Sequence, residues 1–418
     1  MKILITILFF LYFSNLNFAS QLLIPMDDSQ SNHLKAYGLS YYLLENGIII
    51  EWMLNYRGGS FLTPHLMNIE EELIIRGISY EVLADGQVNK IKKEIGSPEI
   101  NMEIIQLEKA PKIAVYTPEG KQPWDDAVTL VLEYAEIPYI KIYDSTVINN
   151  GLPEYDWLHL HHEDFTGQYG KFYASFRSYP WYKKQVKSLE ESSKKLGFNK
   201  VSEMKLAVAK KIKNFVIGGG FLFTMCSGTD SFDIALAAHK TDICESMFDG
   251  DPSDENFQDK LDYSNTLGFD KFKLVENPLE YEYSDIDGTH LHKREERLDK
   301  FTLFEFSAKW DIIPTMLTQC HTKMIKGFMG QTTDFKKELI KSNVLILAET
   351  KAIGTARYIH GEMGLGTWTF YGGHDPEDYQ HRVGDPPTDL NLHPNSPGYR
   401  LILNNILFPA AKKKKRKT

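Results

Sequence analysis

The chain is poor in the features that define several protein classes. Only three cysteines occur among 418 residues, which excludes a small fold built on a disulfide framework. After residue 20, no apolar run approaches the roughly 20 residues that a membrane-spanning helix requires. Positive charge is not in excess either, because 47 lysines and arginines stand against 56 aspartates and glutamates, for a net charge of −9. We therefore expect no transmembrane segment and no nucleic-acid partner.

The remaining composition is that of a folded globular protein. Hydrophobic residues make up 42% of the chain and aromatic residues 12%, which excludes disordered, collagen-like and low-complexity classes. At roughly 100–200 residues per domain, the length predicts two domains or one large α/β domain.

Both ends of the chain carry segments that differ from its centre. Lys2 precedes the apolar run 3–13, and a more polar stretch then ends in Ala19 and Ser20. This pattern predicts a secretory signal peptide over residues 1–20, and hence an exported protein that is periplasmic or extracellular. Six consecutive cations at 412–417 define a basic tail, residues 412–418.

Strand and helix patterns alternate along the chain, which predicts an α/β fold with a mostly parallel sheet and helices on both faces. An N-terminal βαβ module is expected over residues 21–105, from strands at 22–26 and 48–55 and a helix at 31–44. A second α/β domain is expected over 106–411, with insertions near 165–215 and 240–300. Its predicted strands lie at 113–116, 139–143, 157–161, 221–225, 301–306, 344–348, 356–360 and 367–371.

Cys226 lies where an apolar strand turns into a helix. The first N–H groups of a helix favour a thiolate, and the N–H of Ser227 is placed to stabilise an oxyanion. His374 follows a later strand, and parallel strands gather their sites at their carboxyl ends. We therefore expect Cys226 as nucleophile, His374 as general base and Glu377 as the group that orients the base.

These residues resemble a motif of the class I glutamine-amidotransferase-like superfamily. The matching positions are Cys226 with Gly228, and His374 with Pro376 and Glu377. The run 364–376 is similar to the trehalose-utilisation-type branch, whose members commonly lack the cysteine. The resemblance covers roughly residues 110–410. It implies a flavodoxin-like fold and hydrolase or amidotransferase-like chemistry that needs no cofactor.

A histidine and carboxylate cluster at 159–164 offers a different chemistry. His161, His162 and His374 form an alternative set of three zinc ligands, with water as the fourth. Further candidate ligands for such a site are His159, Glu163, Asp164, His290 and His292. The sequence thus predicts a site without a cofactor, and zinc is the one cofactor that it suggests as an alternative.

The pentad 227–231 resembles a shortened pyrophosphate loop of asparagine synthetases, and the chain is similar to an exported bacterial group often labelled asparagine-synthetase-B-like. The pentad lacks the second glycine that lets a backbone approach phosphate. Asparagine synthesis is therefore the least favoured alternative.

The sequence predicts an exported amidotransferase-like protein with a Cys-His hydrolase or amidase site and an unidentified small-molecule, peptide or sugar substrate. A non-catalytic envelope protein that binds a ligand or an envelope protein partner on the same fold is the alternative. Catalysis by cysteine requires Cys226 and His374 within reach of one bridging water. A zinc-dependent hydrolase requires His161, His162 and His374 to converge.

Overall fold

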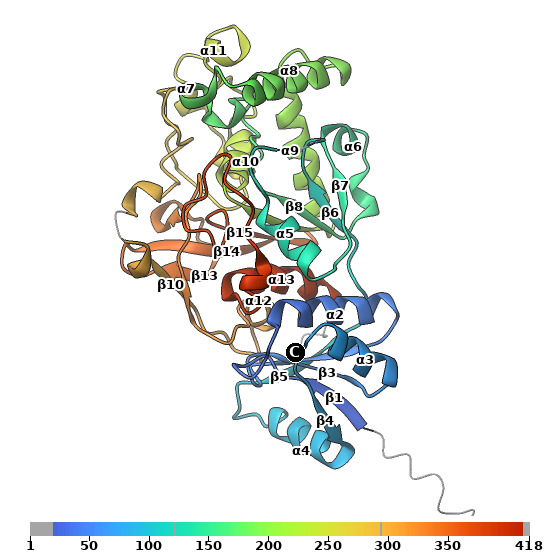
Figure 1. Cartoon of the computed structure of the whole chain (residues 1–418). Helices are drawn as coiled ribbons and strands as arrows, with labels where there is room; N and C mark the ends of the chain where they lie inside the picture. Colours follow the sequence, from blue (N-terminus) through green and yellow to red (C-terminus); the bar gives the residue numbers. More distant parts are fainter. Residues whose placement is uncertain (1–19, 121, 293–294, 413–418) are drawn as a thin grey trace, which may run out of the picture.

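The computed structural model describes residues 20–120, 122–292 and 295–412 (Figure 1). The predicted signal peptide lies outside these ranges except for Ser20, which begins the first strand, and so does the basic tail beyond Lys412. Within the described ranges, no helix is both long enough and apolar enough to cross a membrane.

The N-terminal unit contains a five-stranded sheet in the order β4-β1-β3-β2-β5, with every neighbouring pair antiparallel. Its strands are β1 (Ser20–Ile24), β2 (Ile50–Leu54), β3 (Ser60–Pro64), β4 (Glu81–Ala84) and β5 (Glu103–Leu107). Its helices are α2 (His33–Glu45), α3 (Met67–Ile75) and α4 (Asp85–Ile95).

The predicted parallel βαβ arrangement of this unit is therefore wrong. Strands β1 and β2 run in the same direction but do not pair, because β3 lies between them and is antiparallel to both. The turn at 55–59, where Asn55, Arg57, Gly58 and Gly59 all have positive φ, reverses the chain between β2 and β3. A parallel pair needs a crossover of a dozen or more residues, whereas such a short connection permits only an antiparallel hairpin.

The second unit is built on a ten-stranded sheet in the order β11-β10-β13-β14-β15-β9-β8-β6-β7, with β12 paired to β14. Its strands are β6 (Ile113–Tyr116), β7 (Ile140–Ile142), β8 (Trp157–Leu160), β9 (Phe221–Met225), β10 (Lys300–Leu303), β11 (Met324–Lys326), β12 (Phe335–Lys336), β13 (Leu345–Thr350), β14 (Thr355–Met363) and β15 (Gly366–Tyr371). Its helices are α5 (Ala127–Tyr134), α6 (Asp144–Ile148), α7 (Tyr173–Phe176), α8 (Pro180–Lys195), α9 (Val201–Ile217), α10 (Gly228–Ala237), α11 (Ser246–Asp249), α12 (Ile312–Leu317) and α13 (Pro397–Leu407).

Only one half of this sheet is parallel. Strands β7, β6, β8, β9 and β15 run in one direction, and every other pairing is antiparallel. The predicted mostly parallel, flavodoxin-like sheet is therefore wrong. The eight predicted strands overlap strands of this sheet, whereas β11 and β12 were not predicted. The physical reason lies in tight turns at Gly354 and Gly364, both with positive φ, which make hairpins of β13–β14 and β14–β15.

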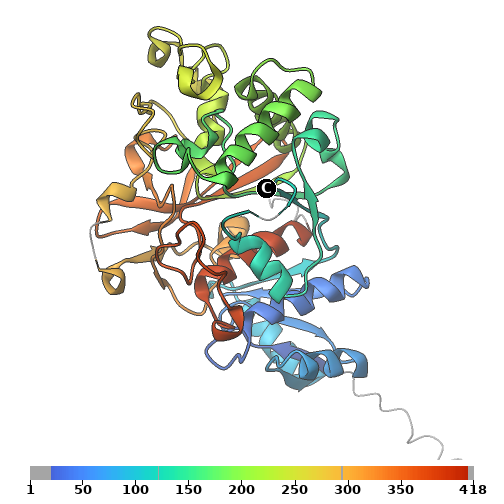
Figure 2. The ribbon, with the colours of Figure 1, turned by 45° about the horizontal axis from the view of Figure 1, so that its top comes forward.

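Helix α13 joins the two units, since it packs against α2 of the first and α5 of the second (Figures 1 and 2). Arg400 on α13 is fully buried, and its guanidinium donates hydrogen bonds to the carbonyl oxygens of Met26 and Gly58 and to the Tyr37 hydroxyl. One hydrophobic core runs through both units around this helix. The units are thus parts of one packed body.

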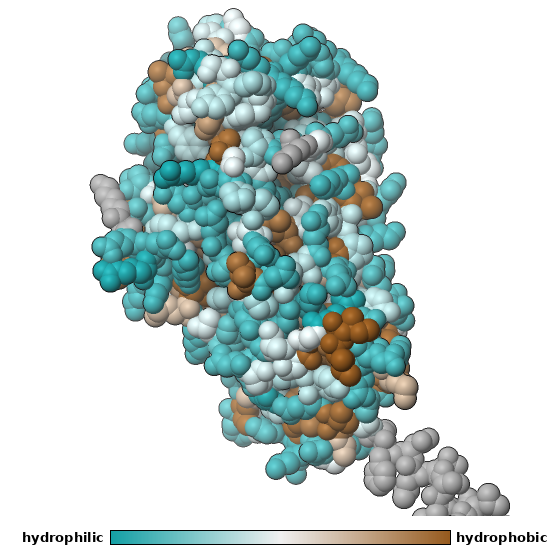
Figure 3. All heavy atoms as spheres, viewed as in Figure 1, coloured by the Kyte–Doolittle hydropathy of each residue, from teal (hydrophilic) through white to brown (hydrophobic). Residues whose placement is uncertain are grey.

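Apolar surface gathers over α3 of the N-terminal unit (Figure 3). Met67, Ile74 and Ile75 are each more than half exposed there, at 78%, 64% and 76%. The residues that carry chemistry lie instead on the second sheet.

Candidate functional site

The carboxyl ends of the parallel strands bring the sequence-predicted site residues to one edge of the sheet. His161 and His162 directly follow β8, Cys226 follows β9 and His374 lies beyond β15. Their strands are neighbours or nearly so, because β9 lies between β8 and β15. This is the edge at which parallel sheets place ligands.

A cavity of about 280 Å³ opens at this edge. His162, Cys226, Ser227 and His374 all line it. The other lining residues are Trp124, Phe172, Tyr281, Thr289, Met329, Gly330, Gln331, Gln380, His381 and Val383. Among these described residues there is no lysine, arginine, aspartate or glutamate, so the wall combines aromatic rings with neutral polar groups.

Histidines and aspartates converge beside the cavity in three overlapping sets. The ligand atoms of His161, His162 and His374 all lie within 4.8 Å of one another, as the zinc alternative requires. Asp125, His374 and His381 form a second set under the same limit, and Asp126, His159 and His161 form a third.

Most of these imidazoles have one ring nitrogen engaged and the other directed into the cluster. His162 donates from Nε2 to the Asp125 carbonyl oxygen at 2.6 Å, which leaves Nδ1 as its free lone pair. His381 donates from Nδ1 to Asp378 Oδ2 at 2.9 Å, and His159 donates from Nδ1 to the Phe223 carbonyl oxygen at 3.0 Å. Metal-binding histidines are held in this way by a second shell that fixes the tautomer.

Asp126 supports the cluster from the helix beside it. Its Oδ1 caps α5 by accepting hydrogen bonds from Val128 and Thr129, and it also lies 3.4 Å from His161 Nδ1. Its Oδ2 lies 3.4 Å from His159 Nε2. Although burial opposes ionisation, these two imidazoles hold the pKa of Asp126 well below its ordinary value.

Several buried polar atoms in the cluster have no hydrogen-bond partner within the described part of the chain. They are both ring nitrogens of His161 and of His374, Nε2 of His159 and His381, and both carboxylate oxygens of Asp125. Each such atom costs about 1–3 kcal/mol when left unpaired, so a concentration of them is a place where ordered water or a ligand would be stabilised.

Burial disfavours the charged form of the imidazoles of His161, His162 and His374. It lowers the pKa of His161, and it lowers the pKa values of His162 and His374 well below the ordinary range, with neighbouring imidazoles adding to the effect. A neutral imidazole is the form that binds a metal ion.

Cys226 occupies a strained turn between β9 and α10, with φ of 49°. The close packing around this turn requires Gly228, because a Cβ atom there would lie 2.8 Å from the His161 carbonyl oxygen. The Gly228 N–H donates to that same carbonyl oxygen at 2.8 Å. The cysteine turn and the end of β8 are thus fixed to each other.

The sulfur of Cys226 faces backbone N–H groups. Gln331 donates to Sγ at 3.4 Å, and the N–H groups of Ser227 and Thr332 also point at it. Burial nevertheless raises the pKa of this thiol to about 11, and the three N–H groups offset only part of that rise. Within the described residues the sulfur has no hydrogen bond to His374, although both side chains line the cavity.

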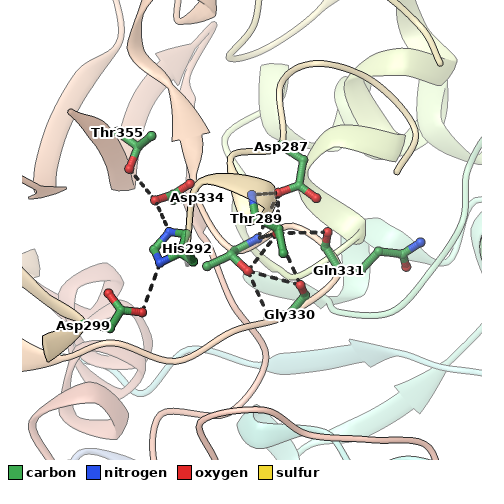
Figure 4. A network of polar contacts seen from close by, with 9 residues as sticks. Asp287, Thr289, His292, Asp299, Gly330, Gln331, Asp334 and Thr355 are labelled. Atoms are coloured by element: carbon green, nitrogen blue, oxygen red, sulfur yellow. Dashed lines mark hydrogen bonds and ion pairs between the residues drawn. The ribbon is translucent and has the colours of Figure 1, made fainter. Parts of the chain in front are cut away.

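A polar network holds the loop 330–333 that supplies Gln331 (Figure 4). Thr289 donates to Asp287 Oδ1 and accepts a hydrogen bond from the Thr333 N–H at 3.0 Å. Nearby, His292 lies between two carboxylates, with Nδ1 at 3.1 Å from Asp299 and Nε2 at 2.7 Å from Asp334. His292, which the sequence offered to a zinc site, thus has both nitrogens engaged elsewhere.

Glu377 does not contact His374. Its carboxylate lies 3.2 Å from His393 Nδ1, whereas His374 Nε2 approaches Asp125 Oδ1 at 4.0 Å. The pentad 227–231 forms the buried start of α10, where Ser231 donates to the Glu163 carbonyl oxygen.

Sequence reasoning missed Asp125, Asp126 and His381. The two aspartates had a usable signal, because they lie in the segment after the predicted strand 113–116, and aspartate is a favoured residue at the start of a helix. His381 lies in a long loop, and nothing in its local pattern places it at the cluster.

Comparisons with known proteins do not identify this chain. No protein-family model matches it, and neither does any curated protein. A cytoplasmic protein of Salmonella typhimurium aligns with a TM-score of 0.34 at 10% identity, and one of Salmonella typhimurium LT2 with 0.35 at 12%. Each alignment covers 72% of this chain and 100% of the other. Likeness at this level supports no inference about activity.

Proposed function

We propose that this protein is a metal-dependent hydrolase, with His161, His162 and His374 as ligands of one divalent ion. The observation that carries the proposal is the convergence of three imidazoles whose ligand atoms lie within 4.8 Å of one another. His162 and His374 line the cavity, and the ring nitrogens of the buried His161 and His374 have no hydrogen-bond partner among the described residues. Three nitrogen ligands and an open fourth position are typical of catalytic zinc, whereas structural zinc sites are closed.

The neighbouring groups suit this role. Asp126 and the Asp125 carbonyl oxygen hold the rings of His161 and His162 from behind, which orients their free lone pairs. A zinc ion bound there would lower the pKa of its water to about 7. In hydrolysis the water oxygen bonds to the substrate carbonyl carbon, the carbon–nitrogen or carbon–oxygen bond breaks, and the proton from water passes to the leaving group.

The cavity wall indicates the class of substrate. Apart from the proposed ion, the described lining residues carry no charged side chain that would pair with a phosphate or carboxylate elsewhere on the substrate. Trp124 and Phe172, with ring centroids 5.3 Å apart, offer an apolar face instead. We therefore expect a neutral amide or ester with an apolar or sugar-like group next to the scissile bond.

The test is metal content and hydrolysis in the same preparation. We expect zinc to copurify, a chelator to abolish cleavage of p-nitrophenyl acetate or neutral p-nitroanilides, and added zinc to restore it. His162→Gln should reduce the rate at least 100-fold. His393→Gln is the matched control, since His393 is a half-exposed histidine paired with Glu377 outside the cluster. Absence of bound metal from the protein would refute the proposal.

A second candidate is a cysteine hydrolase with Cys226 as nucleophile and His374 as base. The positive φ at Cys226 and the N–H groups around its sulfur favour it. The thiol pKa of about 11 weighs against it, because almost no thiolate is present at neutral pH.

Alkylation separates the two candidates. If the thiol is unactivated, iodoacetamide should label Cys226 in the folded protein more slowly at pH 8 than in the unfolded chain, and His374→Ala should not change that rate. Cys226→Ala should then retain its hydrolytic activity. Rapid labelling at pH 6 that depends on His374 would favour the cysteine mechanism, and failure of both candidates would favour a non-catalytic binding protein.

A further inference from the structure

We propose that the site binds a second divalent ion, with Asp125 and His381 as its own ligands and His374 lying between the two ions. This inference rests on the proposed metal-dependent function and makes the centre a binuclear one. It concerns groups that the first ion does not contact.

One ion on His161, His162 and His374 does not account for all the polar atoms of the cluster that lack a hydrogen bond. An ion bound by His161, His162 and His374 takes one nitrogen from each ring. It leaves both oxygens of Asp125 and Nε2 of His381 without a hydrogen bond among the described residues, with only their mutual contact at 3.3 Å, although these side chains are only 9% and 4% exposed. Buried groups of this kind are normally satisfied, and a carboxylate with an imidazole is a donor pair that divalent metals accept.

The geometry of these groups is that of a ligand set. Asp125 Oδ1 lies 3.3 Å from His381 Nε2 and 4.0 Å from His374 Nε2, so both imidazoles approach the same carboxylate oxygen. The rings of His374 and His381 are parallel, at 5° and 4.4 Å between centroids. Their ligand atoms and that of Asp125 lie within 4.8 Å of one another.

A second shell is also in place for this ion. Asp378 accepts the Nδ1 hydrogen of His381 at 2.9 Å, which leaves Nε2 free to bind. This carboxylate–histidine pair has the arrangement that holds a ligating ring in one tautomer. His374 belongs to both ligand sets, and neither of its ring nitrogens has a hydrogen bond to a described residue. Because a neutral imidazole has a single lone pair, His374 would serve both ions as an imidazolate, with its ring proton released to solvent.

Two ions with a shared ligand suit the neutral cavity. In two-metal hydrolytic sites, one ion binds the attacking water and the other stabilises the oxygen that gains negative charge. Because the described cavity lining has no lysine or arginine for that second task, an ion held by Asp125 and His381 would supply the positive charge.

The experiment is metal stoichiometry in the full chain, measured by inductively coupled plasma mass spectrometry and by titration of the metal-free protein with Co²⁺. We expect two ions per chain in the wild type, and one each in Asp125→Asn, His381→Gln and His162→Gln. Asp378→Asn should weaken the second ion about 10- to 100-fold without affecting the first. His393→Gln should retain both ions.

The outcomes separate this inference from the proposed function. One ion in the wild type that survives Asp125→Asn and His381→Gln would overturn the second site and leave the first intact. A single ion lost equally in His162→Gln and His381→Gln would show one centre that shares all these ligands, which also overturns the inference. No bound ion in the wild type would overturn both proposals. Retention of the first ion in His381→Gln shows that this variant folds.

Discussion

Two groups of buried histidines and aspartates in this protein differ in how their charges are balanced. His292 lies between Asp299 and Asp334, both ring nitrogens are engaged, and these carboxylates raise its pKa to about 9 against the effect of burial. In the cluster of His161, His162 and His374, burial lowers the pKa values and ring nitrogens remain unpaired. The first group is complete without a ligand, whereas the second keeps polar atoms that no described residue satisfies.

The largest effect is expected from breaking the complete group. His292→Ala would leave two buried carboxylates without their shared cation, so we expect a loss on the order of 3–5 kcal/mol in the free energy of unfolding. Urea denaturation at pH 7 measures it. A loss below about 1 kcal/mol would show that the carboxylates are satisfied in some other way.

The pH dependence of the same group gives the next largest effect. Because folding raises the His292 pKa from its ordinary 6.5 to about 9, its stabilisation is complete below pH 6.5 and is lost as pH rises through 9. The shift corresponds to at most about 3 kcal/mol. Denaturation curves of wild type and His292→Ala should therefore converge between pH 6.5 and 9.5, and a constant difference would contradict this assignment.

At the histidine cluster, by contrast, removing a buried charge should not lower the stability of the metal-free protein. Asp125→Asn removes a buried carboxylate whose pKa burial raises to about 6, so we expect the metal-free variant to be as stable as the wild type or up to about 1–2 kcal/mol more stable. With zinc present the order should reverse, since only the wild type retains all its ligands. Thermal unfolding with and without zinc tests both halves of this prediction.

The smallest effect on stability is expected from the contact of Thr289 with loop 330–333. Thr289→Val removes the hydroxyl that bonds Asp287 and the Thr333 N–H, at a cost of about 1–2 kcal/mol. Because loop 330–333 lines the cavity, KM should rise more than kcat falls. Thr318→Val is the control, as its hydroxyl bonds only the Pro314 carbonyl oxygen one helical turn earlier; an equal change in KM there would indicate a general loss of packing.

Sequence patterns located the strands of the second sheet well, but not their pairing. The strands at 113–116 and 221–225 match β6 and β9 residue for residue, because short apolar runs between turn residues have a local cause. The direction of pairing depends on connections such as Gly364, where a tight turn fixes an antiparallel hairpin. In the N-terminal unit, β3 went unpredicted, and with it the antiparallel sheet.

The site was likewise predicted only where its residues follow a local pattern. His161, His162 and His374 follow strands, so the rule that parallel strands meet at one edge located them. The contact of Glu377 with His393 and of His381 with Asp125 depends on the course of a loop after β15, which has no periodicity to interpret. Burial, which sets the pKa values of Cys226 and His374, likewise follows from tertiary packing.

The position of α13 has a consequence for the order in which the chain folds. The N-terminal unit is synthesised first, yet Tyr37 and the carbonyl oxygen of Met26 find their partners on a helix that is synthesised some 360 residues later. Contacts between residues so distant in sequence form slowly. Until α13 is synthesised, the side of α2 that packs against it therefore stays exposed. A nascent chain that stops before α13 should therefore depend on chaperones, and completion of the helix should release it.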